Sequence, residues 1–329
     1  MRSFFRVQFQ TLRVLHALSV CLALGSILAF LSWAWWPFEI LSHFRLQTMV
    51  LCLVAVIVYL LKRKLVHAFL LAICVLLNFS VVLPHLFFFG VPQKIGNYPD
   101  NFKIMHLNVD LENLEFDKVI AYIRQEQPDF VLLEEIDENW EKRLEVLFDD
   151  YPHAFTVPRQ DSFGFAFYSK APLIQPSLFY FDSSEVPAMI TGVNLGRETI
   201  NVVGMHTVPP SGNLQLRQRN EQFFTLAKIL SKPRTRATMV IGDLNATPWS
   251  YAMEEMVESG RLHNALNSSG VFGTWPCNNW AFRIPVDHCL VSDRIVVLGR
   301  NVGPDVGSEH LPLVVKFAVE KESGRRIGK

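Results

Sequence analysis

Three long runs without Asp, Glu, Lys or Arg lie between Val14 and Gly90, and they exclude an ordinary water-soluble domain over this part of the chain. Val14 to Trp36 has the length that a helix needs to cross the hydrocarbon core of a bilayer. Leu46 to Leu61 is short for a span, whereas Leu65 to Gly90 is long. The sequence therefore predicts a membrane region over residues 1–92, with three transmembrane helices at about 14–36, 46–61 and 65–90.

Two other interpretations of the first run fit the sequence less well. A cleaved signal peptide would have a shorter apolar core and a small-residue cleavage site, and two further apolar runs would not follow it. Buried helices of a soluble protein would alternate polar and apolar residues with the helical period, and these runs do not. A multi-pass membrane region remains the prediction.

The distribution of basic residues predicts the orientation of this region. The tail before the first run carries three arginines, and the turn between the second and third runs is Lys62-Arg63-Lys64. Because Lys and Arg favour the cytoplasmic side, we expect the N-terminus inside and the residues after the third span outside. Trp33, Trp35 and Trp36 would then lie at the outer interface, where indole rings are favoured.

Beyond the membrane region the composition changes. The first 100 residues hold eight basic and two acidic residues, which leaves 23 basic and 29 acidic residues, a net charge of about −6, after Asp100. We expect a linker over residues 93–100, an enzymatic domain over 101–320 and a polar tail over 321–329. The cysteines are too few and too scattered for a disulfide scaffold, and whether Cys277 and Cys289 pair stays open.

Short β-type runs alternate with amphipathic stretches in this second region. Because strands outnumber helices and several gaps have hairpin length, a layered α/β sandwich with mixed sheets is favoured over a doubly wound parallel sheet. A helix is also predicted to start at Thr247-Pro248. The expected strands are 102–109, 129–133, 164–169, 188–195, 199–206, 237–242, 286–291, 295–299 and 313–319, and the expected helices are 114–127, 138–148 and 214–230.

Polar side chains stand at the ends of these strands, where ligand sites form in layered sheets. Carboxylates, carboxamides and histidines without thiols suit a hard cation such as Mg²⁺ rather than zinc. Such a site suits phosphate ester hydrolysis, in which the metal neutralises phosphoryl oxygens and a histidine takes a proton from water. The residues are Asn108, Glu134, Glu135, His206, Asp243, Asn245, Asp287, His288, Ser308, Glu309 and His310.

Six short motifs containing these residues occur in the order of one family. They are LNV with Asn108, DFVLLEE with Glu135, GMH with His206, GDLN with Asp243 and Asn245, PVDH with Asp287, and SEHLP with His310. Over about residues 101–319 the chain resembles a membrane-anchored bacterial member of the endonuclease/exonuclease/phosphatase superfamily. The resemblance implies a DNase I-like four-layered α/β sandwich after the transmembrane helices.

The resemblance also implies roles for individual residues. Glu135 would be the principal Mg²⁺ ligand with Asn108 beside it, and Mn²⁺ is the alternative ion. His310 would be the general base, polarised by Glu309, which stands where the family normally has Asp. The remaining implied roles are orientation of the attacking water or assistance to the leaving oxygen by Asp243, phosphate binding by Asn245 and His206, and a hydrogen bond within the site by Asp287.

Other polar residues are interpreted as structural. We expect Arg219 to be a surface residue of its helix. Strand alternation points His106 to the same side as Asn108, and Glu134 away from Glu135. His288 is likewise interpreted as a neighbour of the site.

Together these observations predict a phosphoester hydrolase, most generically a phosphodiesterase, on the outer side of a bacterial cytoplasmic membrane. The alternatives left open are nuclease against phospholipase or sphingomyelinase specificity, and a non-catalytic membrane sensor or scaffold. The net acidity offers no broad electrostatic footprint for DNA. The expected partners are the lipid bilayer and a substrate that is a lipid headgroup or a nucleic acid, and no stable protein partner or oligomeric state is predicted.

Overall fold

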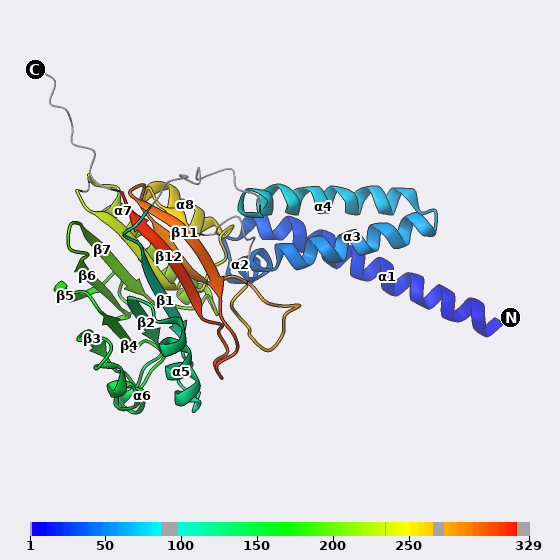
Figure 1. Cartoon of the computed structure of the whole chain (residues 1–329). Helices are drawn as coiled ribbons and strands as arrows, with labels where there is room; N and C mark the ends of the chain where they lie inside the picture. The colour runs from blue at the N-terminus through cyan, green and yellow to red at the C-terminus, as the bar shows by residue number, and fades with distance from the viewer. Residues whose placement is uncertain (1, 87–97, 234, 266–272, 321–329) are drawn as a thin grey trace, which may run out of the picture.

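The computed structural model describes residues 2–86, 98–233, 235–265 and 273–320, with a bundle of N-terminal helices beside an α/β sandwich (Figure 1). The N-terminus and the turn between the last two helices of the bundle lie at the end that points away from the sandwich. The basic turn Lys62-Arg63-Lys64 is therefore at the opposite end of the bundle from the sandwich. The bundle consists of α1 (Arg2–Leu28), η1 (Ala29–Leu31), α2 (Trp36–His43), α3 (Arg45–Leu61) and α4 (Leu65–Leu86).

Two segments of the described helices, Arg13–Leu31 and Leu65–His85, are long and apolar enough to cross a membrane. A third span results if α2 and α3, which meet at a bend of 67°, form one broken segment. The first apolar span ends at Leu31 and not at the predicted residue 36, because the chain starts a new helix at Trp36 with Pro37 in its first turn. The expected end of the third span, residues 87–90, lies outside the described residues.

The bundle has polar groups inside and apolar side chains outside. The Asn78 amide donates to Ser26 Oγ at 2.8 Å and accepts from Arg45 Nη1 at 3.2 Å, and both contacts are buried. Leucine, valine and phenylalanine side chains along the same helices are exposed, among them Leu24, Leu60 and Phe69. This arrangement is the one expected of helices that face lipid, where interior hydrogen bonds join the helices.

The sandwich consists of two six-stranded mixed sheets. The first sheet has the order β11-β12-β1-β2-β4-β3 and the second the order β5-β6-β7-β8-β10-β9. The strands of the first sheet are β1 (Phe102–Asn108), β2 (Phe130–Glu134), β3 (His153–Val157), β4 (Phe165–Ser169), β11 (Ile295–Val302) and β12 (Leu313–Val319). Those of the second are β5 (Leu173–Tyr180), β6 (Pro187–Asn194), β7 (Thr199–Met205), β8 (Ala237–Asp243), β9 (His263–Asn264) and β10 (Asp287–Val291).

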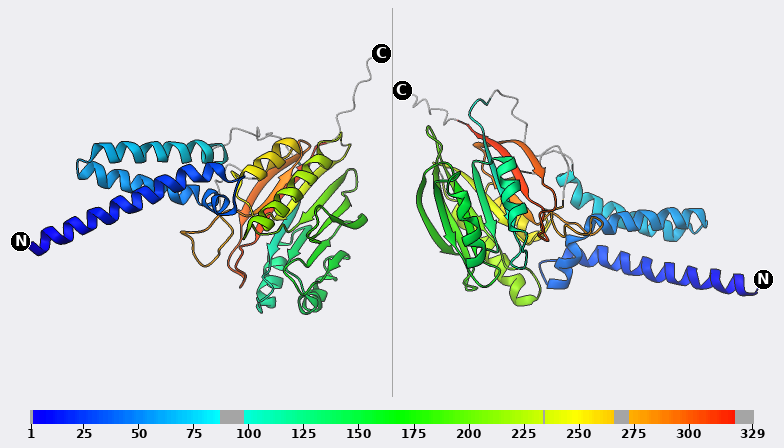
Figure 2. Two further views of the ribbon diagram at one scale, coloured as in Figure 1. Left: turned by 180° about the vertical axis from the view of Figure 1, so that it is seen from behind. Right: turned by 60° about the horizontal axis from the view of Figure 1, so that its bottom comes forward.

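Helices cover the outer face of each sheet and complete four layers (Figure 2). Trp140 packs beneath the first sheet and Phe223 beneath the second, each within a buried cluster that joins helices to strands. A third cluster, with Leu132 and Met239, fills the space between the sheets. The covering helices are α5 (Phe116–Glu126), α6 (Glu138–Leu144) and the following η2 (Glu145–Leu147) on one side, and α7 (Asn213–Leu230) and α8 (Tyr251–Ser259) on the other.

Strand alternation explains which side chains face the second sheet. On β1, Ile104 belongs to the inter-sheet core whereas Met105 packs toward the covering helices, so His106 and Asn108 share the inter-sheet face with Ile104. On β2, Leu132 lies in the inter-sheet core, and Glu134 follows on the same face. Polar groups at the ends of β1 and β2 are therefore directed at the second sheet.

The DNase I-like α/β sandwich that the sequence predicted is the fold of the chain, with some local differences. The helix predicted to start at Thr247-Pro248 begins three residues later, at Tyr251, with Ser250 as its N-cap. Strands β3, β5 and β9 are additional to the predicted set. Cys277 and Cys289 are both free thiols.

The junction between the bundle and the sandwich combines polar and aromatic contacts. The Trp249 indole donates to Ser42 O at 2.8 Å, and Gln47 Nε2 donates to Arg283 O at 3.2 Å. Phe44 meets Phe282 edge-on, at 6.3 Å between ring centroids. The loop that carries Phe282 also carries Trp280, and these side chains are 57% and 83% exposed. The sandwich is thus docked on the end of the bundle where α2 ends and α3 begins.

Candidate active site

The predicted site residues converge at one end of the sandwich. Strands β1 and β2 run parallel, as do β7 and β8, and β10 pairs antiparallel with β8 so that Asp287 lies opposite Asp243. Residues at the ends of these strands are therefore neighbours in space. They surround a cavity of about 680 Å³. Its lining includes Glu135, His206, Asp243, Asn245, Glu309 and His310.

Asp243 lies at the centre of this group. Its Oδ2 is 3.6 Å from His206 Nε2, 3.6 Å from His310 Nε2 and 3.4 Å from Asn108 Nδ2. The preceding Gly242 has φ +151°, and a Cβ there would lie 2.1 Å from Met205 O. Only glycine allows β8 to approach β7 this closely, and the approach sets the position of Asp243.

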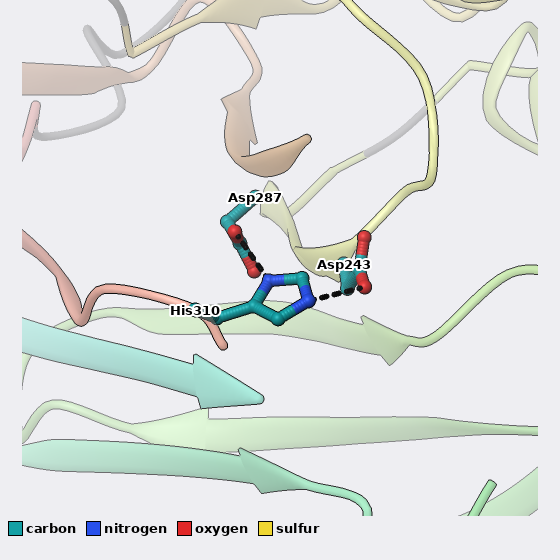
Figure 3. A group of neighbouring side chains, drawn as sticks. All are labelled: Asp243, Asp287 and His310. Carbon is teal, nitrogen blue, oxygen red and sulfur yellow. Dashed lines mark hydrogen bonds and ion pairs between the residues drawn. The ribbon is translucent and has the colours of Figure 1, made fainter. Parts of the chain in front are cut away.

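His310 is held between two buried carboxylates (Figure 3). Its Nδ1 is 3.0 Å from Asp287 Oδ2, and its Nε2 faces Asp243. The expectation that Glu309 polarises His310 is wrong for this structure, because the Glu309 carboxylate accepts from the Trp275 indole at 3.3 Å. Asp287, which the sequence placed in the site without this role, orients the imidazole.

The electrostatics of the site follow from this arrangement. Burial alone would lower the pKa of His310, but the carboxylates of Asp287 and Asp243 outweigh burial and raise the pKa to about 10. Burial raises the pKa of Asp287, but the neighbouring His310 outweighs it and holds the pKa well below its usual range. Imidazolium and carboxylate therefore form a charge pair beside the cavity.

A second layer of titratable groups, His106 and Glu134, contacts this pair, although the sequence analysis interpreted both residues as structural. His106 Nε2 is 2.9 Å from Glu134 Oε2, and His106 Nδ1 is 3.4 Å from Asp287 Oδ1. Glu134 Oε2 also accepts from the backbone N–H of Asp243 at 2.9 Å. His106 thus contacts Asp287, and Glu134 holds the backbone of Asp243.

Glu135 and Asn108 form a further polar pair at the cavity. Asn108 Nδ2 donates to Glu135 Oε1 at 2.9 Å, and Glu135 Oε2 accepts from the N–H of Leu111 at 3.2 Å. Glu135 has a left-handed backbone with φ +63°, which costs a non-glycine residue of the order of 1–3 kcal/mol. This backbone turns Glu135 into the cavity, while Glu134 points between the sheets.

The donor set fits a divalent cation. Within the described residues, Asp243, Asp287 and His310 offer ligand atoms that all lie within 4.8 Å of one another. In addition, the carboxylates of Glu135 and Asp243 both accept from the Asn108 Nδ2 group, so two acidic groups lie close together at the cavity. These oxygen-rich groups are ligands that hard cations prefer.

Asn245 completes the cavity wall and leads to a second correction. Its side chain donates to Thr207 O at 2.9 Å, and its backbone N–H donates to Asp243 Oδ1 at 3.0 Å. Its carbonyl accepts from Arg219 Nη1 at 3.1 Å. Arg219 was expected on the surface of its helix, but it is fully buried because Glu39 of α2 neutralises its charge at 2.6 Å.

The bundle also contributes directly to the cavity. Ile40 and His43, both on α2, belong to its lining together with residues of the sandwich. His43 Nε2 is 3.2 Å from Glu39 Oε1, which ties this part of the lining to the buried ion pair. One wall of the site is therefore built by a helix that precedes the domain predicted to carry the chemistry.

Comparison with known proteins agrees with this geometry. The sequence model of the Endonuclease/Exonuclease/phosphatase family matches residues 105–310, which is more than half of the chain. The chain therefore belongs to this family of phosphoester hydrolases. Its fold holds a buried cluster of Asp243, Asp287 and His310. No match is found among the curated proteins.

Solved structures share the fold at low sequence identity. D. rerio TDP2 complexed with a single-strand DNA product is 15% identical with a TM-score of 0.57, and the match covers 67% of this chain and 99% of TDP2. SmcL is 20% identical with a TM-score of 0.54, over 67% and 100% of the two chains. An endonuclease/exonuclease/phosphatase from Beutenbergia cavernae is 18% identical with a TM-score of 0.56, over 67% and 72%.

Proposed function

We propose that the chain is a membrane-anchored, Mg²⁺-dependent phosphodiester hydrolase. The observation that carries this proposal is the position of His310, held at Nδ1 by Asp287 with Nε2 directed at Asp243 beside the cavity. An imidazole oriented by a carboxylate on one side, with its other nitrogen at a cavity, is the arrangement of a general base. The membership of the family supports the same reaction.

In the proposed reaction the neutral form of His310, which a bound cation would favour, takes a proton at Nε2 from a water molecule. The water oxygen then forms a bond to phosphorus and the bond from phosphorus to the leaving oxygen breaks. The leaving oxygen takes a proton from solvent, and the imidazolium of His310 returns its proton to solvent. Asp287 holds the ring orientation and stabilises the imidazolium that forms. Asp243 orients the water or assists the leaving oxygen, and Asn245 and His206 hold phosphoryl oxygens from the cavity wall.

Glu135 and Asn108 would hold the Mg²⁺ ion, with Asp243 close to both. When bound, the ion would neutralise phosphoryl oxygens, and it would offset the negative charge of the carboxylates that raise the pKa of His310. The left-handed backbone at Glu135 supports this assignment, because strained backbone at a cavity is typical of functional positions.

A phosphodiester presented at the membrane surface is the favoured substrate. The cavity wall includes Ile40 and His43 of the bundle, so the site opens beside the helices that would enter lipid. We propose that the sandwich lies on the outer side of a bacterial cytoplasmic membrane, since the basic turn at residues 62–64 is at the far end of the bundle. A nucleic acid is the alternative substrate, and D. rerio TDP2 with its DNA product is a relative of that kind by fold.

The test is a panel of phosphodiesters offered to the full chain with Mg²⁺ and with EDTA. The panel contains DNA, RNA, phospholipid and sphingomyelin vesicles, and inositol phosphates. We expect hydrolysis that EDTA abolishes and that His310→Ala reduces by about 10²–10⁴-fold. His263→Ala is the control, because this exposed histidine pairs with Asp293 away from the cavity. Hydrolysis of none of the panel would favour the non-catalytic sensor instead.

A further inference from the structure

The side chain of Glu39 joins the bundle to the sandwich at a buried point. Its Oε1 accepts from Arg219 Nη2 at 2.6 Å and from Ser250 Oγ at 2.6 Å, and it is 3.2 Å from His43 Nε2. Glu39 and Arg219 are both almost fully buried. A buried carboxylate is tolerated when it is paired and hydrogen-bonded, and these three partners supply a charge and hydrogen bonds at Oε1.

The guanidinium of Arg219 carries this contact on to the cavity. While Nη2 binds Glu39, Nη1 donates to the carbonyl of Asn245 at 3.1 Å. Asn220 Oδ1 accepts from Nε at 3.2 Å and from Nη2 at 2.8 Å, which fixes the plane of the fork. The planar guanidinium therefore bridges α2 and the turn after β8 with rigid geometry that a lysine could not reproduce.

Asn245 needs such support because its backbone is left-handed, with φ +46°. Asparagine adopts this conformation more readily than most residues, but the turn still has to be held by its surroundings. Its N–H is bound to Asp243 Oδ1 and its carbonyl to Arg219. The Arg219 bond thus fixes the peptide that carries a phosphate-binding side chain and that adjoins Asp243.

We propose that Glu39 is a positioning residue, which acts through Arg219 to set Asn245, so that the active site is complete only while α2 is docked on the sandwich. This inference rests on the proposed function for the role of Asn245. Ile40 and His43 line the cavity next to Glu39, so the same short helix supports Asn245 through Arg219 and also forms one wall of the cavity. Activity would then depend on contact between the two halves, and not on the sandwich alone.

The experiment uses the full chain in lipid nanodiscs, with Glu39→Gln and Arg219→Lys as the test variants. Arg219→Lys keeps a cation beside Glu39 but loses the fork that reaches Asn245, so it separates docking from positioning. The matched control is Glu254→Gln, which breaks another contact between the two halves, the 3.4 Å pair with His85. The readouts are kcat and KM for a soluble phosphodiester, and the affinity for inorganic phosphate with Mg²⁺.

We expect Arg219→Lys and Glu39→Gln to weaken phosphate binding and to lower kcat/KM by about tenfold or more, with thermal unfolding of Arg219→Lys close to that of the wild type. Glu254→Gln should stay within twofold in both readouts. Folded test variants that also stay within twofold would overturn the proposal. If neither variant folds, Ser250→Ala decides the case, because it removes one neutral hydrogen bond from Glu39 and should weaken phosphate binding a few-fold.

The two proposals fail in different ways. A wild-type chain that binds phosphate but hydrolyses no phosphodiester would contradict the proposed function, and the phosphate affinities of the variants would still test the role of Glu39. A wild-type chain that hydrolyses phosphodiesters while all the variants match it would contradict only the role of Glu39. A wild-type chain that neither binds nor hydrolyses would overturn both.

Discussion

The helical bundle and the sandwich bury polar groups for different purposes. In the bundle, Arg45, Asn78 and Ser26 join helices whose outer surfaces are apolar. At the end of the sandwich a row of acids and histidines is buried, and among the described residues Glu134 Oε1 has no hydrogen-bond partner. Burying charge in this way is costly, so the sandwich keeps a cluster that packing alone would not select. The titratable groups of the site thus belong to the sandwich, whereas the apolar outer surface belongs to the bundle, which also adds one wall of the cavity.

The sharpest test of this division concerns the sides of the membrane. Because the basic turn and the sandwich are at opposite ends of the bundle, we expect the C-terminus outside the cytoplasm. Alkaline phosphatase fused after Lys329 should be active, and green fluorescent protein at the same position should be dark. The reverse result from the two fusions would put the active site inside the cell.

Removing the charge of Glu135 should have the largest effect on catalysis within the sandwich. Glu135→Gln keeps the shape of the side chain but loses a carboxylate ligand, and a metal contributes several kcal/mol to such reactions, so turnover should fall by about 10³-fold or more. The bundle and the fold should be unchanged. Near-normal Mg²⁺-dependent turnover by a folded variant would show that the cation is held elsewhere.

The carboxylate that serves His310 can be identified from rates and pH profiles. Asp287→Asn should lose roughly 10²-fold, within the range of general acid–base catalysis, whereas Glu309→Gln should lose far less. The base form of His310 exists above its pKa, which Asp287 and Asp243 raise and a bound cation would lower again, so the wild-type rate should rise with pH through this pKa. Without the charge of Asp287 this pKa falls, and the ascending limb should move to lower pH.

Equal losses in Asp287→Asn and Glu309→Gln would contradict this assignment, as would an ascending limb at the same pH in both. Glu309→Asp serves as the conservative control, because it keeps a carboxylate beside Trp275. We expect its pH profile to match that of the wild type at equal Mg²⁺ concentration.

The smallest effect should come from the loop that lies against the bundle. Trp280 is 83% exposed and lies two residues before Phe282, which contacts Phe44 of the bundle, so we expect its indole to enter the interface of a membrane around the bundle. Trp280→Ala should lower turnover of a lipid phosphodiester in vesicles a few-fold and leave a soluble phosphodiester unaffected. Phe148→Ala, which removes an exposed aromatic side chain directly after η2, should change neither rate.

Much of the fold could be predicted from the sequence because strand alternation and motif order are local. Asn108, Glu135, His206, Asp243, Asn245 and His310 were named from strand ends, and parallel pairing brings those ends together. The partner of His310 could not be chosen correctly, because the family resemblance implied Glu309, whereas Asp287 reaches the ring from β10, which is distant in the sequence.

The contact between Glu39 and Arg219 was also beyond sequence reasoning. The two residues are 180 positions apart, and neither has a motif. An exposed arginine is the ordinary case on a polar helix, and its burial here depends on a single acid in an apolar region. That isolated acid is the signal that could have been used, since a carboxylate near a membrane span calls for a buried cation.

Because α2 forms one wall of the cavity, the proposed lipid substrate would reach the site from within the membrane plane and not from the surrounding solution. A phosphodiester held in the same leaflet would reach Ile40 and His43 by lateral diffusion, so its supply is set by molecules per unit area and not by concentration in the surrounding volume. Adding inert lipid at constant total substrate would then slow the reaction, because the mole fraction falls. The rate of an enzyme with this geometry would therefore depend on the lipid composition of its own membrane.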